Sequence, residues 1–256
     1  MPLALRLLPI IHMRNLKITV QYDGARYHGW QRQGDLPTIQ KIIEEAVFTI
    51  TRQESHVASS GRTDAGVHAL GQAANFLTAS QLPLRNLLRG INSLLPEDIK
   101  IVDIAEVPPE FHARFSARGK TYLYKIFNSP VPSVFHRNYS WYIYEELDVE
   151  KMAEAARFLN GRHDFTCFCA AGHETKTYER EVTRAEFSRE GDLIIFRIES
   201  NGFLKYMVRN IVGTLSYVGK RKITPESFRD IIEARDRTVA GPTAPPQGLF
   251  LEKVTY

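Results

Sequence analysis

Apolar and polar residues alternate with a period of two at several points along the chain, and this alternation predicts strands. In residues 16–22 (LKITVQY), for example, apolar side chains occupy every second position. Two further segments, residues 181–187 and 193–200, flank the turn residues 190–192 (EGD) and predict a hairpin. The predicted strands are residues 16–22, 72–78, 99–107, 121–127, 181–187, 193–200 and 249–254.

Apolar residues spaced three and four positions apart predict helices between these strands. Asp148 is placed to act as an N-cap, and Thr224 followed by Pro225 is a typical helix start. The proline-rich segment 241–248 (GPTAPPQG) is expected to hold one conformation near the last strand. The predicted helices are residues 38–52, 82–95, 149–160, 204–218 and 225–234.

Strands and helices follow a similar order in both halves of the chain, although no sequence repeat is visible. Each half resembles the split β-α-β-β-α-β plan. We therefore predict an α/β (α+β) protein with two ferredoxin-like or RRM-like lobes, mainly antiparallel sheets and a cleft between them. Residues 13–110 would form the N-terminal lobe and residues 111–256 the C-terminal lobe. Residues 1–12 are expected to be a disordered extension before Met13.

Composition places the chain among ordinary globular proteins and excludes several classes. Of 256 residues, 43% are hydrophobic and 24% charged, which excludes disorder along the whole chain. Two cysteines exclude a disulfide framework and a four-cysteine zinc site, and indicate a reducing compartment. No apolar run reaches eighteen residues, so we expect a cytoplasmic protein that does not cross a membrane.

The distribution of charge is more informative than the net charge of +4. Residues 65–96, 111–144 and 200–225 contain no aspartate or glutamate, yet they contain arginines and lysines. Buried strands would exclude both signs of charge, whereas a polyanion-binding surface excludes only the negative one. These segments therefore predict a basic cleft.

The glycine-rich segment 60–71 (SGRTDAGVHALG) carries a single carboxylate, Asp64, two residues after Arg62. An aspartate on such a turn is usually a cap or turn former. A neighbouring guanidinium keeps a carboxylate ionised, however, and an ionised carboxylate suits a nucleophile better than a general acid. Arg209 stands among apolar residues and needs an anionic partner, either Asp64 or another carboxylate in a structural ion pair.

Several long segments, in order and suitably spaced, resemble the bacterial tRNA pseudouridine synthase A family. They are YDGARYHGWQRQ, SSGRTDAGVHALGQ, HARFSARGKTYLYKI, HDFTCF, GFLKYMVRNIVG and PPQGLFL, and the resemblance extends from about Met13 to Leu251. It implies an enzyme that converts uridine to pseudouridine at positions 38, 39 and 40 of the tRNA anticodon stem-loop. It also implies a homodimer that uses no cofactor and no metal.

The same resemblance implies roles for individual residues. Asp64 would be the nucleophile, attacking either C1′ of the ribose or C6 of the uracil of a flipped-out uridine. Tyr122 would stack on the uracil and assist removal of the C5 proton, and Arg209 would be the partner of Asp64. Arg62 would hold the target base out of its stack, and Leu249 would pack at the base pocket.

Lys120 and Arg114 are further candidates for substrate contact, because they alternate with aromatic residues in segment 111–124. Such alternation is typical of proteins that combine RNA backbone contacts with base stacking. His68 and Trp30 are expected to be structural, the first through hydrogen bonding and the second in the core or at a contact between the lobes.

Other interpretations of the residues remain. The spacing of His163, Cys167, Cys169 and His173 suggests zinc, but one residue between the cysteines is too tight, so Cys167 is expected to be buried instead. A non-catalytic RNA-binding module would make Asp64 dispensable. A hydrolase of nucleosides or sugars would need a second carboxylate, which the acid-free segments near Asp64 do not supply.

Overall fold

The computed structural model describes residues 13–172 and 175–256, so the predicted extension 1–12 lies outside the described residues. The strands are β1 (Arg14–Tyr22), β2 (Ala58–Ser59), β3 (His68–Thr78), β4 (Ile99–Val107), β5 (Gly119–Asn128), β6 (Trp141–Ile143), β7 (Gly161–Asp164), β8 (Glu179–Glu190), β9 (Leu193–Ser200) and β10 (Leu249–Thr255). The α-helices are α1 (Ile39–Thr51), α2 (Leu84–Leu94), α3 (Val149–Ala156), α4 (Met207–Gly219) and α5 (Pro225–Ala234). Short 3₁₀ turns occur at Arg157–Leu159, Thr166–Phe168, Arg237–Val239 and Pro246–Gly248.

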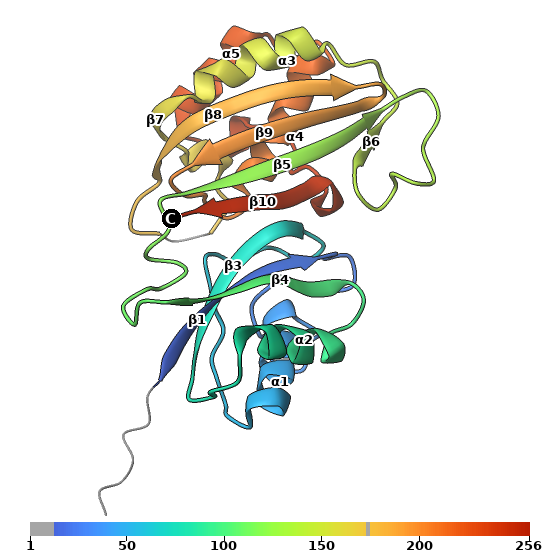
Figure 1. Cartoon of the computed structure of the whole chain (residues 1–256). Coiled ribbons are helices and arrows are strands. Elements are labelled where there is room, and N and C mark those ends of the chain that lie inside the picture. The colour runs from blue at the N-terminus through green and yellow to red at the C-terminus, as the bar shows by residue number, and fades with distance from the viewer. Residues whose placement is uncertain (1–12, 173–174) are drawn as a thin grey trace, which may run out of the picture.

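The strands form one continuous sheet in the order β4-β1-β3-β10-β5-β9-β8-β7 (Figure 1). Most neighbours are antiparallel, which confirms the predicted mixed α/β class. β10 joins the two halves of the sheet: it pairs in parallel with β3 through only two registered positions and antiparallel with β5 along most of its length. This junction was not predicted, because a period of two identifies a strand but not its neighbour.

Local sequence explains where the helices begin. The Asp148 carboxylate accepts a hydrogen bond from the Lys151 N–H, and the Thr224 hydroxyl accepts one from the Ser227 N–H, so both predicted N-caps are confirmed. α4 starts at Met207, three residues later than predicted. The three short strands β2, β6 and β7 were not predicted, because two to four residues are too few to show an alternation.

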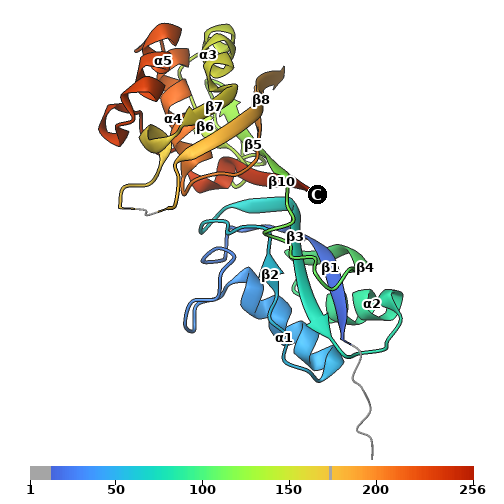
Figure 2. The same cartoon turned by 90° about the vertical axis from the view of Figure 1, so that its left-hand side faces the viewer.

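The helices pack against the two halves of the sheet separately. In Figure 1, α1 and α2 lie with β1, β3 and β4 in the lower lobe, and α3, α4 and α5 lie with the upper strands. Figure 2 shows the narrow waist where β3 and β10 run next to each other. Across the part of the chain that the structure describes, no helix is long and apolar enough to cross a membrane.

Candidate active site

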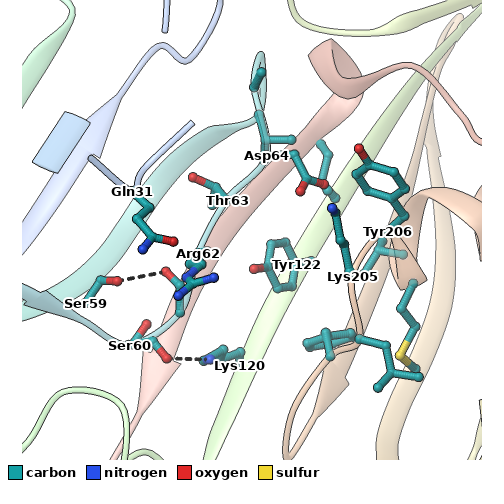
Figure 3. A pocket seen from close by; sticks show the side chains of 18 of the residues that line it. Gln31, Ser59, Ser60, Arg62, Thr63, Asp64, Lys120, Tyr122, Lys205 and Tyr206 are labelled. Atoms are coloured by element: carbon teal, nitrogen blue, oxygen red, sulfur yellow. Dashed lines mark hydrogen bonds between the residues drawn. The ribbon is translucent and has the colours of Figure 1, made fainter. Parts of the chain in front are cut away.

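A cleft of about 900 Å³ is lined by residues from both halves of the chain (Figure 3). Its walls come from the loop after β1, the β2–β3 loop, the start of β5, the segment that enters α4 and the start of β10. Six of the seven predicted site residues line it: Arg62, Asp64, Arg114, Lys120, Tyr122 and Leu249. The seventh, Arg209, does not line the cleft but contacts Asp64 from α4.

The β2–β3 loop that carries Asp64 is held by hydrogen bonds on both of its sides. The Val67 N–H donates to the Asp64 carbonyl (3.2 Å), which closes a tight turn containing Gly66 at φ +76°. The side chain of the preceding Thr63 shares a 2.8 Å hydrogen bond with the Tyr22 hydroxyl. The loop therefore presents Asp64 from a fixed backbone.

Two glycines in the loop after β1 let that loop approach the Asp64 loop closely. A Cβ on Gly24 would lie 2.0 Å from the Val67 carbonyl oxygen, and one on Gly29 would lie 2.5 Å from the Thr63 carbonyl oxygen. Such distances exclude any side chain at either position. Gly24 and Gly29 of the YDGARYHGW segment thus allow the loop after β1 to pack against the loop that carries Asp64.

Arg209 and Asp64 form an ion pair. A guanidinium nitrogen of Arg209 lies 3.6 Å from the Asp64 carboxylate, and their side chains are 13% and 30% exposed. Of the two partners that the sequence left open for Arg209, the structure selects Asp64. Burial raises the pKa of the Asp64 carboxyl, while the positive charges of Arg209 and Lys205 oppose that rise.

The proline-rich segment 241–248 orients Arg209. The Arg209 Nε donates to the Ala244 carbonyl (2.7 Å), and the Ala244 N–H donates back to the Arg209 carbonyl (3.1 Å). The segment lies directly against α4, since a Cβ on Gly213 would be 1.6 Å from the Pro242 carbonyl oxygen. Sequence reasoning predicted an ordered loop here but not that the loop holds a residue of the site.

Tyr122 forms an aromatic wall of the cleft. Its side chain is 8% exposed and meets Phe203 edge to face, with ring centroids 4.9 Å apart. Burial raises the pKa of the Tyr122 hydroxyl, so the phenol stays neutral. Within residues 13–172 and 175–256 the hydroxyl has no hydrogen-bond partner, which leaves it available to a ligand.

Four cations line the cleft without a carboxylate within 4.0 Å among the described residues: Arg62, Arg114, Lys120 and Lys205. The Lys120 ammonium donates to the Ser60 carbonyl (2.7 Å). Burial, with the nearby charges of Arg114 and Arg180, lowers the pKa of Lys120 to about 8. Arg32, which also lines the cleft, is paired with Glu44, and Arg26 outside it is paired with Asp98. A cleft of unpaired cations suits a polyanionic ligand.

The residues expected to be structural are buried. The His68 Nδ1 accepts a hydrogen bond from the Gly24 N–H (3.1 Å), and Trp30 is 2% exposed in the core. Cys167 is fully buried, as expected. His173 of the weighed zinc motif lies outside the described residues, and the described ones contain no cluster of three or more metal-ligating side chains.

Sequence reasoning missed Lys205, Tyr206 and Phe203, which form the wall facing the β2–β3 loop. It placed Lys205 and Tyr206 in the first turn of the predicted helix 204–218 and used Lys205 only as part of the acid-free segment 200–225. No sequence signal identified Tyr206, because it has a left-handed backbone that no periodicity reveals.

Known proteins resemble this chain along nearly its whole length. A family model described as tRNA pseudouridine synthase matches residues 18–116 and 155–256. The tRNA pseudouridine synthase A of Moorella thermoacetica is 47% identical over 94% of this chain and 99% of its own length. That of Thermoanaerobacter sp. strain X514 is 46% identical over 95% and 100%. The tRNA pseudouridine synthase A 2 of Clostridium perfringens is 45% identical over the same shares.

A solved structure of an unknown protein from Galdieria sulphuraria aligns over 82% of this chain and 94% of its own, but its TM-score of 0.23 and 12% identity are too low to support a comparison. The matched family segments include the Asp64 loop, and most of the cleft's walls lie within them. The chain therefore belongs to the tRNA pseudouridine synthase family, isomerases that convert uridine to pseudouridine in tRNA.

Proposed function

We propose that this enzyme isomerises uridines 38, 39 and 40 of the tRNA anticodon stem-loop, with Asp64 as its nucleophile. One observation carries the assignment of Asp64. Among the described residues that line the cleft, Asp64 is the sole carboxylate, and it stands among unpaired cations. A single anionic nucleophile in a site built for a polyanion is what this isomerisation needs.

The chemistry balances without a cofactor. The Asp64 carboxylate attacks C1′ of the ribose or C6 of the uracil, and the glycosidic bond from N1 to C1′ breaks. The uracil rotates and C5 bonds to C1′, so that the carboxylate is released. The proton on C5 is lost and N1 gains one, which leaves the formula unchanged. A neutral Tyr122 suits stacking on the uracil and hydrogen bonding better than proton abstraction.

The geometry of the cleft supports the proposed substrate contacts. Arg62 is exposed on the Asp64 loop, where it can enter the space that a flipped base leaves. Lys120 and Arg114 line the same cleft, and their positive charges would bind phosphates. Leu249, 5% exposed at the start of β10, supplies an apolar contact for the base. Flipping costs a few kcal/mol of stacking, which phosphate contacts can offset.

The family resemblance supports a homodimer in which each tRNA contacts both subunits, with residues 13–110 and 111–256 forming the two lobes of each subunit. Sedimentation of the full chain at micromolar concentration tests the dimer directly. A single species of 29.2 kDa would contradict it.

The first test is tritium release from C5-labelled uridine in unmodified tRNA, without added metal. The wild type should release tritium and Asp64→Asn should not, while Asp64→Asn still binds tRNA. Asp35→Asn, which changes an exposed carboxylate outside the cleft, is the matched control and should behave like the wild type. Release by Asp64→Asn at the wild-type rate would refute the nucleophile.

Transcripts with a single uridine at position 38, 39 or 40 test the site of modification. Release from these three, and not from a transcript whose only labelled uridine lies outside the anticodon stem-loop, supports the proposed positions. Binding of tRNA by the wild type without release from any transcript would favour a non-catalytic RNA-binding module.

A further inference from the structure

Tyr206 holds a left-handed backbone conformation (φ 64°, ψ 3°) where the chain enters α4. Arg52, Arg221 and Arg235 also have positive φ, but each follows the end of a helix, where this conformation is common. A residue that precedes a helix is ordinarily extended, and the left-handed region is unfavourable for a tyrosine. The conformation therefore needs a reason beyond starting the helix.

The backbone of Tyr206 turns its ring into the wall of the cleft beside Asp64. The Lys205 ammonium lies 5.4 Å and the Arg209 guanidinium 4.9 Å from the ring centroid. In Figure 3 the Tyr206 ring is separated from the Tyr122 ring, and the Lys205 side chain runs between them. Two aromatic surfaces thus flank the position of the Asp64 carboxylate.

The Tyr206 hydroxyl has no hydrogen bond within the part of the chain that the structure describes. Its ring is half-buried, so one side packs against protein cations while the rest faces the cleft. An aromatic face beside cations is the arrangement that proteins use to stack single nucleobases while contacting the adjoining phosphates.

We propose that Tyr206 stacks on the nucleobase next to the target uridine in the bound RNA. When the target flips out toward Tyr122, its neighbour loses a stacking partner on one face. The Tyr206 ring, separated from Tyr122 by Lys205, is placed to cover that face while Lys205 contacts the phosphate between the two nucleotides. The inference rests on the proposed function and adds a residue that binds substrate.

Four substitutions separate the ring from the backbone. Tyr206→Phe keeps the ring, and Tyr206→Leu removes it but keeps an apolar side chain. Tyr206→Gly removes the ring and relieves the left-handed backbone. Tyr217→Leu is the matched control, because Tyr217 is also half-buried on α4 with a lysine ammonium 5.2 Å from its ring, yet it does not line the cleft.

Steady-state tritium release from tRNA gives the first measurement. Tyr206→Leu and Tyr206→Gly should raise KM roughly five- to a hundredfold, the range expected for one lost stacking contact, with kcat unchanged. Tyr206→Phe and Tyr217→Leu should match the wild type. An unchanged KM in Tyr206→Leu would overturn the proposal. So would a lower kcat at unchanged KM, because Tyr206 would then act by positioning Arg209.

The second measurement uses 2-aminopurine in place of the base on either side of the target uridine, in two separate RNAs bound to proteins that also carry Asp64→Asn. At one of the two positions the fluorescence should be lower with Tyr206 intact, or with Tyr206→Phe, than with Tyr206→Leu, because stacking on the ring quenches it. Equal fluorescence at both positions, with and without the Tyr206 ring, would overturn the proposal.

A wild type that releases no tritium would instead refute the proposed function, so failure of the proposal and failure of the proposed function are distinguishable.

Discussion

The guanidinium of Arg209 lies 3.6 Å from the carboxylate of Asp64, and this contact connects α4 to the β2–β3 loop. Arg209 is itself held by Ala244 through a reciprocal pair of hydrogen bonds with 2.7 Å and 3.1 Å donor–acceptor distances. The ionisation of Asp64 therefore depends on the packing of the proline-rich segment 241–248 as well as on its own loop.

Removal of the Arg209 charge should change both the rate and its dependence on pH. Burial already raises the pKa of Asp64, and without the guanidinium that pKa rises further. In Arg209→Gln the acidic limb of the pH–rate profile should move to higher pH, and turnover at neutral pH should fall roughly a hundredfold. Arg197→Gln, which breaks an ion pair with Glu252 outside the cleft, is the control. An unshifted pH–rate profile would show that Arg209 does not change the pKa of Asp64.

Asp64→Asn should stabilise the folded protein at neutral pH. The pKa of the Asp64 carboxyl is higher in the folded protein than in the unfolded one, so the free energy of unfolding falls as the pH rises between these two values. Above both values the loss of stability is complete. Urea unfolding should therefore show a higher midpoint for Asp64→Asn than for the wild type at pH 7, with the difference disappearing in acid.

Asp98→Asn should change stability at neutral pH in the opposite direction to Asp64→Asn. Burial alone would raise the pKa of Asp98, but hydrogen bonds from Tyr27 (2.6 Å) and Arg26 lower it overall. Such a carboxylate contributes stability at neutral pH that is lost as the pH falls through its folded pKa. Asp98→Asn should cost about 1–3 kcal/mol at pH 7. A midpoint that falls for both variants would contradict the sign assigned to Asp64.

Gly213→Ala should impair catalysis from a position outside the cleft. The added methyl group would lie 1.6 Å from the Pro242 carbonyl oxygen, so segment 241–248 must move away from α4 and release Arg209. We expect a loss of about 1–3 kcal/mol in the free energy of unfolding and a lower kcat. Gly119→Ala, whose new Cβ would be 3.5 Å from the nearest atom, should be mild in both respects. An equal kcat in Gly213→Ala and Gly119→Ala would show that the position of segment 241–248 does not affect catalysis.

Lys120 should make tRNA binding sensitive to pH. Its pKa is lowered to about 8, so the side chain is cationic at pH 7 and loses its charge above pH 8. tRNA affinity at constant salt should fall roughly tenfold between pH 7 and 9, the contribution of one charged hydrogen bond. Lys120→Arg should abolish that change, and Lys253→Arg, on the exposed part of β10, should keep it. The same pH dependence in Lys120→Arg would assign it to another group.

The residues proposed to carry this protein's chemistry could be named from the sequence alone. Alternation and helical spacing located most of the strands and all five helices, because those patterns reflect the burial of one face of each element. The acid-free segments predicted a basic cleft, and the resemblance of six motifs to a known family indicated Asp64, Tyr122 and Arg209. These features depend on residue type and short-range spacing, which the sequence records directly.

Only the tertiary structure decided how these pieces meet. The parallel contact of β10 with β3, the choice of Asp64 as the partner of Arg209, and the support of Arg209 by Ala244 all join segments far apart in the chain. The left-handed turn at Tyr206, which directs a ring into the cleft, is a backbone choice without a periodic signal. Contacts of this kind depend on the packing of many residues at once, so no local pattern could specify them.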